Sequence, residues 1–124
     1  MWKPFITVLT LLLFSSCAGP ELPDTPGNSV VRTYTALTSG DSLGYLESLA
    51  RQKREVFESM PEAVHDLLVR WKGEHAVVTV LSVRGNDTLS TVVYNLTVTG
   101  PHPSEQDSLV AQVHREADGW KEGY

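Results

Sequence analysis

The hydrophobic pattern of this chain changes period once, and that change constrains the fold more than any other feature. Between Ser29 and Trp71, apolar residues recur every three or four positions, which is the spacing of amphipathic helices. From His75 to Tyr124 they alternate with polar residues and are rich in valine and threonine, which is typical of half-buried strands. The 124 residues are enough for one domain. Helices followed by strands predict an α+β domain, with the helices packed on one face of an antiparallel sheet.

Three helices are expected in the first part of the domain. Ser39-Gly40 ends the first, and Asp41 or Ser42 can cap the second. The segment 59–62 (SMPE) has the pattern of a capping box for the third. The charged run 51–58 is expected either to extend the second helix or to form an exposed loop. The apolar faces contain Val30, Val31, Tyr34 and Leu37; Leu43, Leu46, Leu49 and Ala50; and Val64, Leu67, Leu68 and Trp71.

About four strands are expected after the helices, at residues 75–84, 88–99, 108–116 and 120–124. Gly85-Asn86-Asp87 and Asp118-Gly119 are turn sequences, because glycine, asparagine and aspartate tolerate the backbone conformations that tight turns need. The segment 100–107 (GPHPSEQD) is expected to be a loop. These strands are therefore predicted to form one antiparallel sheet.

The amino terminus has the features of an export signal and a lipid anchor. The run 5–14 (FITVLTLLLF) carries no charge, but about 20 apolar residues are needed to span a bilayer, so we interpret it as the apolar region of a signal peptide. Ser15-Ser16-Cys17, followed by Ala18, resembles the lipobox of bacterial lipoproteins. That resemblance implies cleavage after residue 16, acylation of Cys17 with palmitate-type chains, and attachment to a membrane of the cell envelope. Secretion with cleavage after Ala18, or a retained uncleaved anchor, are the alternatives.

The segment after the signal peptide is expected to be a tether. Residues 18–28 contain three prolines and two glycines and show no apolar periodicity. The predicted organisation is a signal peptide at residues 1–16, a lipidated cysteine and tether at 17–28, and a domain at 29–124.

Two short motifs resemble those of the nuclear transport factor 2-like superfamily, which has a cystatin-like fold. One is Thr38-Ser39-Gly40-Asp41, between two amphipathic helices, and the other is the ending 115–121 (READGWK). The resemblance implies a strongly curved sheet that wraps around the helices as a cone, often with an internal pocket. With the lipobox, it suggests a small bacterial lipoprotein whose domain belongs to a group of unassigned function.

Composition excludes several classes of function. Ten Lys+Arg against fifteen Asp+Glu give a net charge of −5, whereas nucleic-acid binding requires a basic face. The single cysteine cannot form an internal disulfide. The four histidines, at positions 65, 75, 102 and 114, show no metal-ligand spacing. We therefore expect neither a metal nor a cofactor.

Some members of the superfamily are enzymes, such as steroid isomerases and dehydratases, and the resemblance implies an acid or base and a hydroxyl donor inside the cone. The candidates are Tyr34, Asp66 and His114, with Asp41, His65 and Tyr94 beside them. Most have a structural explanation. Tyr34 falls on an apolar face, Asp41 can cap a helix, and His65 and Asp66 point about 100° apart on a solvated helix face.

The sequence therefore favours a non-enzymatic, membrane-anchored lipoprotein that binds a small ligand or a protein of the envelope. Two alternatives remain. One is an enzyme with a small apolar pocket that uses Tyr34 with either Asp66 or His114. The other is a structural subunit that forms a homodimer through its sheet.

Overall fold

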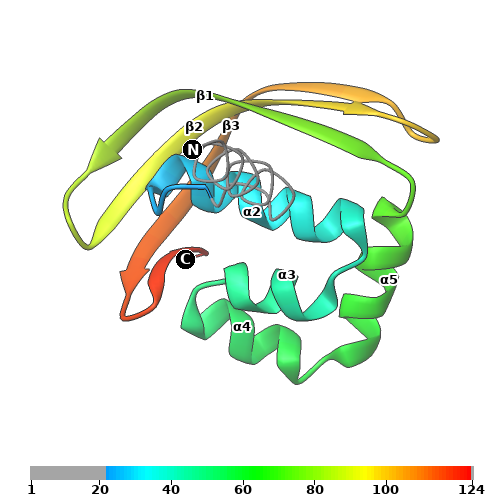
Figure 1. Ribbon diagram of the computed structural model, residues 1–124, viewed down its shortest axis with the longest axis horizontal. Coiled ribbons are helices and arrows are strands. Elements are labelled where there is room, and N and C mark those ends of the chain that lie inside the picture. Colours follow the sequence, from blue (N-terminus) through cyan, green and yellow to red (C-terminus); the bar gives the residue numbers. More distant parts are fainter. Residues whose placement is uncertain (1–21, 124) are drawn as a thin grey trace, which may run out of the picture.

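The computed structural model describes residues 22–123 and confirms the α+β organisation. The helices of this part of the chain are α2 (Pro26–Ser39), α3 (Ser42–Ser48), α4 (Arg51–Glu58) and α5 (Pro61–Trp71). They are followed by the strands β1 (His75–Gly85), β2 (Leu89–Thr99), β3 (Ser104–Glu116) and β4 (Gly119–Glu122). Figure 1 shows the sheet arching over α2, with α3 and α4 beneath that helix and α5 to one side.

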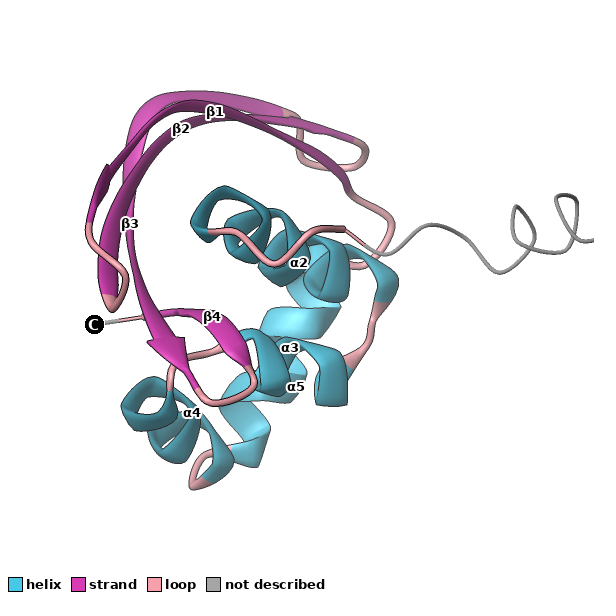
Figure 2. Cartoon of the chain, turned by 60° about the vertical axis from the view of Figure 1, so that its left-hand side comes forward, coloured by secondary structure: helices cyan, strands magenta, loops and turns pink. Residues whose placement is uncertain are grey.

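The strands form one antiparallel sheet in the order β1-β2-β3-β4, as the alternating pattern predicts. Figure 2 shows that this sheet is strongly curved and wraps around α2. The strand register shifts between Val80 and Ser82 and again between Tyr94 and Leu96. Such irregularities bend strands and increase their twist, so they account for part of the curvature. The expected curved sheet is confirmed.

The core lies in two clusters. The first fills the space between α2 and the concave face of the sheet, where every second residue of β2 is buried. The second joins the helices to one another. The buried members of the first are Val30, Val92, Tyr94, Leu96, Val98, Ala111, Val113 and Trp120, and those of the second are Ala36, Leu37, Tyr45, Leu49 and Val64.

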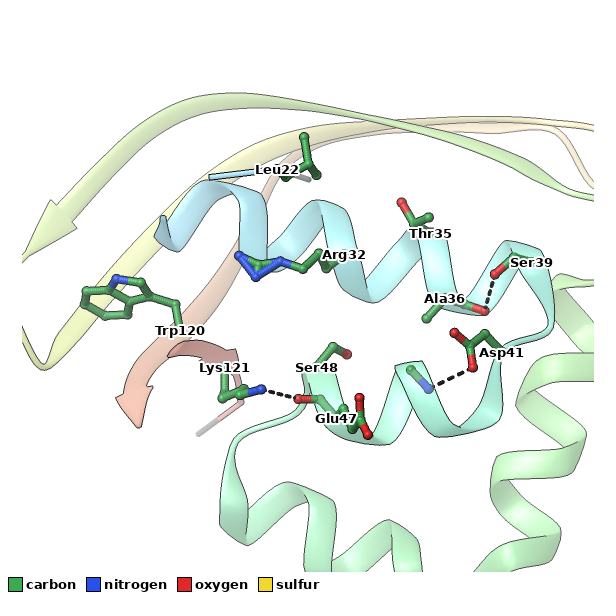
Figure 3. Close-up of a pocket in the computed structure, with 11 residues that line it drawn as sticks. Leu22, Arg32, Thr35, Ala36, Ser39, Asp41, Glu47, Ser48, Trp120 and Lys121 are labelled. Carbon is green, nitrogen blue, oxygen red and sulfur yellow. Dashed lines mark hydrogen bonds between the residues drawn. The ribbon is translucent and has the colours of Figure 1, made fainter. Parts of the chain in front are cut away.

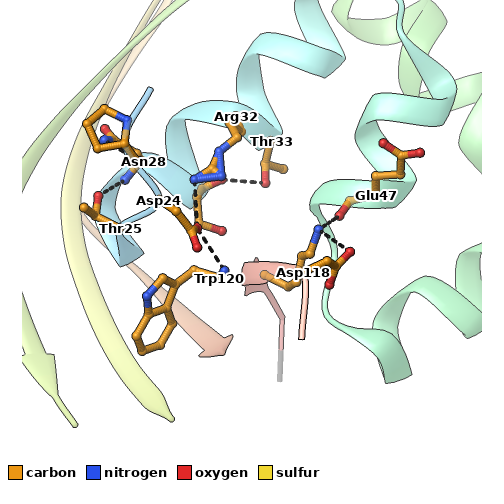
Figure 4. Close-up of polar contacts among 11 residues, drawn as sticks. Asp24, Thr25, Asn28, Arg32, Thr33, Glu47, Asp118 and Trp120 are labelled. Carbon is orange, nitrogen blue, oxygen red and sulfur yellow. Dashed lines mark hydrogen bonds and ion pairs between the residues drawn. The ribbon is translucent and has the colours of Figure 1, made fainter. Parts of the chain in front are cut away.

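Helix α2, the first helix of the described residues, begins at Pro26, inside the segment predicted as a tether. Thr25 caps it by accepting a hydrogen bond from the backbone of Asn28 (3.2 Å). Asp24 accepts hydrogen bonds from the backbone N–H of Trp120 (3.1 Å) and from Arg32 Nη2 (3.2 Å), as Figure 4 shows. Residues 24–28 are therefore part of the domain. The predicted signal peptide, Cys17 and the tether up to residue 21 lie outside the described residues.

Two predictions about helix caps have different outcomes. Asp41 caps α3, as expected, by accepting a hydrogen bond from the backbone N–H of Gly44 (2.9 Å). The capping box at 59–62 is wrong, because Met60 occupies the cap position of α5 and makes no side-chain hydrogen bond there. The Ser59 hydroxyl instead donates to the carbonyl of Val56 (2.6 Å).

The apolar face predicted for the second helix is only partly correct. Leu43 is 66% exposed, and α3 ends at Ser48, so Leu49 and Ala50 are buried in the segment that follows it. This segment runs beside the last strand, where Leu49 forms a β-bridge with Glu122. Leu49 is fully buried because of that strand, which the helical spacing does not reveal.

The charged run 51–58 is a separate helix, neither an extension of α3 nor a loop. Its first N–H group, on Arg51, donates to the carboxylate of Glu116 (2.6 Å), and the N–H of Ala50 donates to the carbonyl of Glu122 (2.7 Å). The start of α4 is therefore held by residues of β3 and β4. An acceptor that is 65 residues away is invisible to local pattern analysis.

The loop predicted at 100–107 is shorter, because β3 begins at Ser104. The buried carboxylate of Glu74 holds this loop by accepting from the backbone N–H of His102 (2.8 Å) and contacting its Nδ1 (3.0 Å). Gly100 lies directly against the same carboxylate, where a Cβ atom would be 2.8 Å from Oε2. Within residues 22–123, no helix has the length and apolar character needed to cross a membrane.

Candidate ligand pocket inside the curved sheet

A pocket of about 180 Å³ lies where the four described helices meet β2 and the end of β4. It has an apolar part and a polar part. The apolar part is lined by Val30, Leu37, Leu67 and Trp71. The polar part is lined by Thr33, Tyr34, Tyr45, Lys53, Tyr94 and Glu122. We call this cavity the tyrosine pocket.

The aromatic rings of the tyrosine pocket are packed edge to face. The ring of Tyr34 lies 5.5 Å from that of Trp71 at an angle of 64°, and 6.0 Å from that of Tyr94 at 63°. This geometry is the favourable one for aromatic pairs, so the rings form a rigid wall. Because Tyr34 comes from α2, Trp71 from α5 and Tyr94 from β2, the wall depends on the packing of helices against the sheet.

The hydroxyl groups of Tyr34 and Tyr94 are 2.9 Å apart and form a hydrogen bond in which either can donate. Burial raises the pKa of Tyr34, and burial together with this hydrogen bond raises the pKa of Tyr94 further. Burial also raises the pKa of Tyr45 to about 12. The negative charge of Glu122 adds to the rise in pKa at all three tyrosines. All three phenols are therefore protonated at neutral pH.

The charged groups of the tyrosine pocket neutralise one another. Lys53 Nζ lies 2.7 Å from Glu122 Oε2, and the two side chains are only 20% and 18% exposed. This ion pair joins α4 to β4 across the polar end of the pocket. With protonated tyrosines and a closed ion pair, the pocket offers hydroxyl groups and aromatic surface but no net charge.

The structure separates the candidates that the sequence suggested. Tyr34 lines the tyrosine pocket together with Tyr94. Asp66 is exposed on α5. His114 is half-buried on β3 and lines a different pocket, together with Ala50, Arg51 and Glu116. Neither Asp66 nor His114 lines the pocket that contains Tyr34.

The remaining candidates have other positions. Asp41 caps α3, and its carboxylate is engaged there. His65 is exposed and lines a groove between α3, α4 and α5. The acidic residue that lines the pocket with Tyr34 is Glu122, in place of the expected Asp66 or His114.

Sequence analysis missed Lys53, Glu122 and Tyr45. Lys53 lies in a charged run that has the composition of an exposed segment, and Glu122 lies in a four-residue strand. Tyr45 falls on α3 at a position that the helical spacing did not single out. Each becomes buried through contacts between distant segments, so no local signal could have marked it.

A second cavity, of about 340 Å³, separates α2 from α3, and Figure 3 shows its lining residues. The side chains of Arg32, Asp41 and Lys121 in its lining have partners within the protein. Lys121 Nζ donates to the carbonyl of Glu47 (2.7 Å) and lies 3.1 Å from Asp118, while Arg32 pairs with Asp24 (3.2 Å). These contacts help to hold α2, α3 and β4 together. Among residues 22–123, no group of His, Cys, Asp and Glu side chains is arranged to hold a metal ion.

The helices on the concave side of a curved antiparallel sheet define a cystatin-like fold. The chain is similar to the crystal structure of a protein of unknown function with this fold from Nostoc punctiforme PCC 73102. The TM-score is 0.58 and the sequence identity 16%, over 77% of this chain and 80% of the other. No protein-family model matches the sequence, and no curated protein does. The similarity therefore establishes the fold.

Proposed function

We propose that this protein is a lipid-anchored protein of the bacterial cell envelope that binds a small uncharged ligand in the tyrosine pocket. The observation that carries the ligand proposal is the combination of three protonated tyrosines with a closed Lys53–Glu122 ion pair in one partly enclosed cavity. A few polar groups that converge in an otherwise apolar cavity are the usual composition of a ligand site.

The pocket favours an uncharged ligand for electrostatic reasons. A buried charge must be paired, and the two charges of the pocket already pair with each other over 2.7 Å. A charged ligand would therefore enter without a partner or would have to break that pair. The volume of about 180 Å³ is below the range of roughly 300–1,000 Å³ found for drug-sized ligands. A single ring with one hydroxyl or carbonyl group fits this description.

The ligand proposal is tested with phenol, benzoate and benzylammonium, which share a ring and differ in charge. The full chain is placed in lipid nanodiscs, and the tryptophan fluorescence is recorded during titration, with empty nanodiscs as the reference. We expect phenol to bind at least tenfold more tightly than either ion. Tyr34→Phe should weaken phenol binding about fivefold, because it removes one hydrogen bond of about 1 kcal/mol.

The control is Thr97→Val, which removes a hydroxyl from the exposed face of β2. This variant should bind phenol like the wild type. Equal affinity for all three compounds would contradict the proposal, as would a Thr97→Val effect as large as that of Tyr34→Phe.

The anchoring proposal rests on the segment that ends at Cys17 and has its own test. Cys17→Ala should move the protein from the membrane fraction to the soluble fraction or leave an uncleaved precursor. Mass spectrometry of the wild-type chain should show acyl chains on the residue that follows the cleaved leader. A wild-type mass without acyl chains would contradict this part of the proposal and leave the ligand proposal standing.

A second candidate function is catalysis of proton transfer, and one observation favours it. The carboxylate of Glu122 and the paired hydroxyls of Tyr34 and Tyr94 line the same pocket, so a base and a hydrogen-bond donor face one cavity. The test is hydrogen–deuterium exchange next to the carbonyl group of cyclohexanone, followed by NMR. An enzyme of this kind should accelerate the exchange in the wild type and lose the effect in Glu122→Gln.

A further inference from the structure

A larger cavity lies on the other side of the second core cluster from the tyrosine pocket. This groove, which we call the helix groove, is bounded by α3, α4 and α5 and has a volume of about 520 Å³. Its floor is apolar and consists of Leu46, Phe57, Val64 and Leu68. Leu46, Phe57 and Leu68 pack against the second core cluster but are only partly buried, so apolar surface next to the core is left uncovered here.

One pair of aromatic rings stands between the helix groove and the tyrosine pocket. Tyr45 lines the pocket and Phe57 lines the groove. Their rings are 6.0 Å apart and meet edge to face at 80°. At this point the wall between the two cavities consists of the rings of Tyr45 and Phe57.

The helix that carries Phe57 has few attachments to the domain. None of the residues of α4 is buried. Its start is held by the Glu116 carboxylate (2.6 Å) and its middle by the Lys53–Glu122 ion pair (2.7 Å). Phe57 is its main apolar contact with the second core cluster. A path between the two cavities at this point requires the ring of Phe57 to move away from that of Tyr45.

We propose that the ligand is an amphiphile whose polar ring occupies the tyrosine pocket and whose apolar chain passes Phe57 into the helix groove. This inference rests on the proposed function, because it assigns the second half of the same ligand. The chain is apolar because four apolar side chains form the floor of the groove, whose polar lining residues are Ser42, Glu58 and His65. The charged Glu58 lies at the rim and is paired with Arg54 at 3.6 Å, so it places no unpaired charge beside the chain.

The test uses phenol and its 4-ethyl, 4-butyl and 4-octyl derivatives, with the full chain in nanodiscs and empty nanodiscs as the reference for partition into lipid. Each methylene group that enters the groove should raise the affinity about fourfold, which corresponds to about 0.8 kcal/mol. Leu46→Asn should remove this gain and leave the affinity for phenol unchanged. The matched control is Leu43→Asn on the same helix, because Leu43 is 66% exposed and does not line the groove.

A second measurement keeps the inference falsifiable if Leu46→Asn fails to fold. A 4-octylphenol with a diazirine at the end of its chain is photolysed on the wild type, and the labelled peptides are identified by mass spectrometry. Labels on Leu46, Phe57 or Leu68, which line the groove but not the tyrosine pocket, support the inference. Labels confined to the sheet or to residues that line the tyrosine pocket overturn it.

The possible failures are distinguishable. If no phenol binds, both the proposed function and this inference are wrong. If phenol binds but the affinity does not rise with chain length, only this inference is wrong. The inference is also wrong if the affinity of Leu46→Asn still rises with the length of the alkyl chain. If the groove of the full chain cross-links to another protein and 4-octylphenol binds no more tightly than phenol, the groove does not hold a ligand chain. In that case the groove is a protein-docking surface, and this inference is wrong.

Discussion

At the residue scale, the hydrogen bond between Tyr34 and Tyr94 ties α2 to the centre of the sheet. Both hydroxyls are largely removed from water, and each has the other as its partner at 2.9 Å. A buried polar group is stable when it has such a partner and costly when it has none. This pair is therefore important for stability whatever the pocket binds.

Removing one of these hydroxyls should lower the free energy of unfolding more than removing both. Tyr94→Phe leaves the hydroxyl of Tyr34 without its partner, and we expect a loss of about 1–3 kcal/mol in the free energy of unfolding. The double variant Tyr34→Phe, Tyr94→Phe should recover part of that loss, because no orphaned group remains. Urea unfolding of the three variants measures this. A double variant that is less stable than Tyr94→Phe alone would show that the explanation is wrong.

The tyrosines also predict how stability depends on pH. The pKa of Tyr45 is about 12 in the folded protein and about 10 in the unfolded chain, so the folded state keeps its proton longer. Its contribution is complete below pH 10 and is lost as the pH rises from 10 to 12, by at most about 3 kcal/mol. Tyr45→Phe should make unfolding less sensitive to pH in this window. Thermal unfolding at pH 8, 10 and 11 measures it, and identical pH profiles for variant and wild type would contradict it.

At the scale of elements, α4 shows how a distant strand can create a helix. Its eight residues include five charged ones, and it buries none of them fully. A helix this short is marginal in isolation, because nucleation is costly. The carboxylate of Glu116 supplies the missing acceptor for its first N–H group, and a negative charge at that end is favourable for the helix dipole.

Glu116→Ala should therefore loosen α4 more than the rest of the domain. Hydrogen exchange of residues 51–58 should become faster, with a loss of about 1 kcal/mol in overall stability. Glu105→Ala is the control, since Glu105 is an exposed carboxylate on the same strand. Equal acceleration in both variants, or none in Glu116→Ala, would rule out this role for Glu116.

At the scale of the whole molecule, the curved sheet has two different faces. The concave face packs against the helices and contains the tyrosine pocket. The convex face carries polar threonines and a few apolar side chains, of which Val110 is 63% exposed and Val77 48%. Val110 lies opposite Val93 in the register, so apolar side chains neighbour one another across β2 and β3.

Pairing through this convex face is the prediction that belongs to the assembled domain. If the protein is a homodimer through its sheet, Val110→Asp should produce monomers, because each copy would bring a charge into the interface. Analytical ultracentrifugation of the full chain in detergent distinguishes the two states. A wild-type monomer would exclude the structural-subunit alternative, and a dimer that Val110→Asp does not change would place the interface elsewhere.

The helix-then-strand order, the Asp41 cap and the alternating burial of β2 follow from the sequence, because each depends on residues only a few positions apart. The tertiary structure alone decided the site. Lys53 and Glu122 are 69 residues apart and form an ion pair only because β4 runs beside the start of α4. Similarly, Tyr34 meets Tyr94 only when the sheet curves around α2. Local spacing determines which element a residue joins, whereas the closing of the curved sheet over the helices determines what that residue faces.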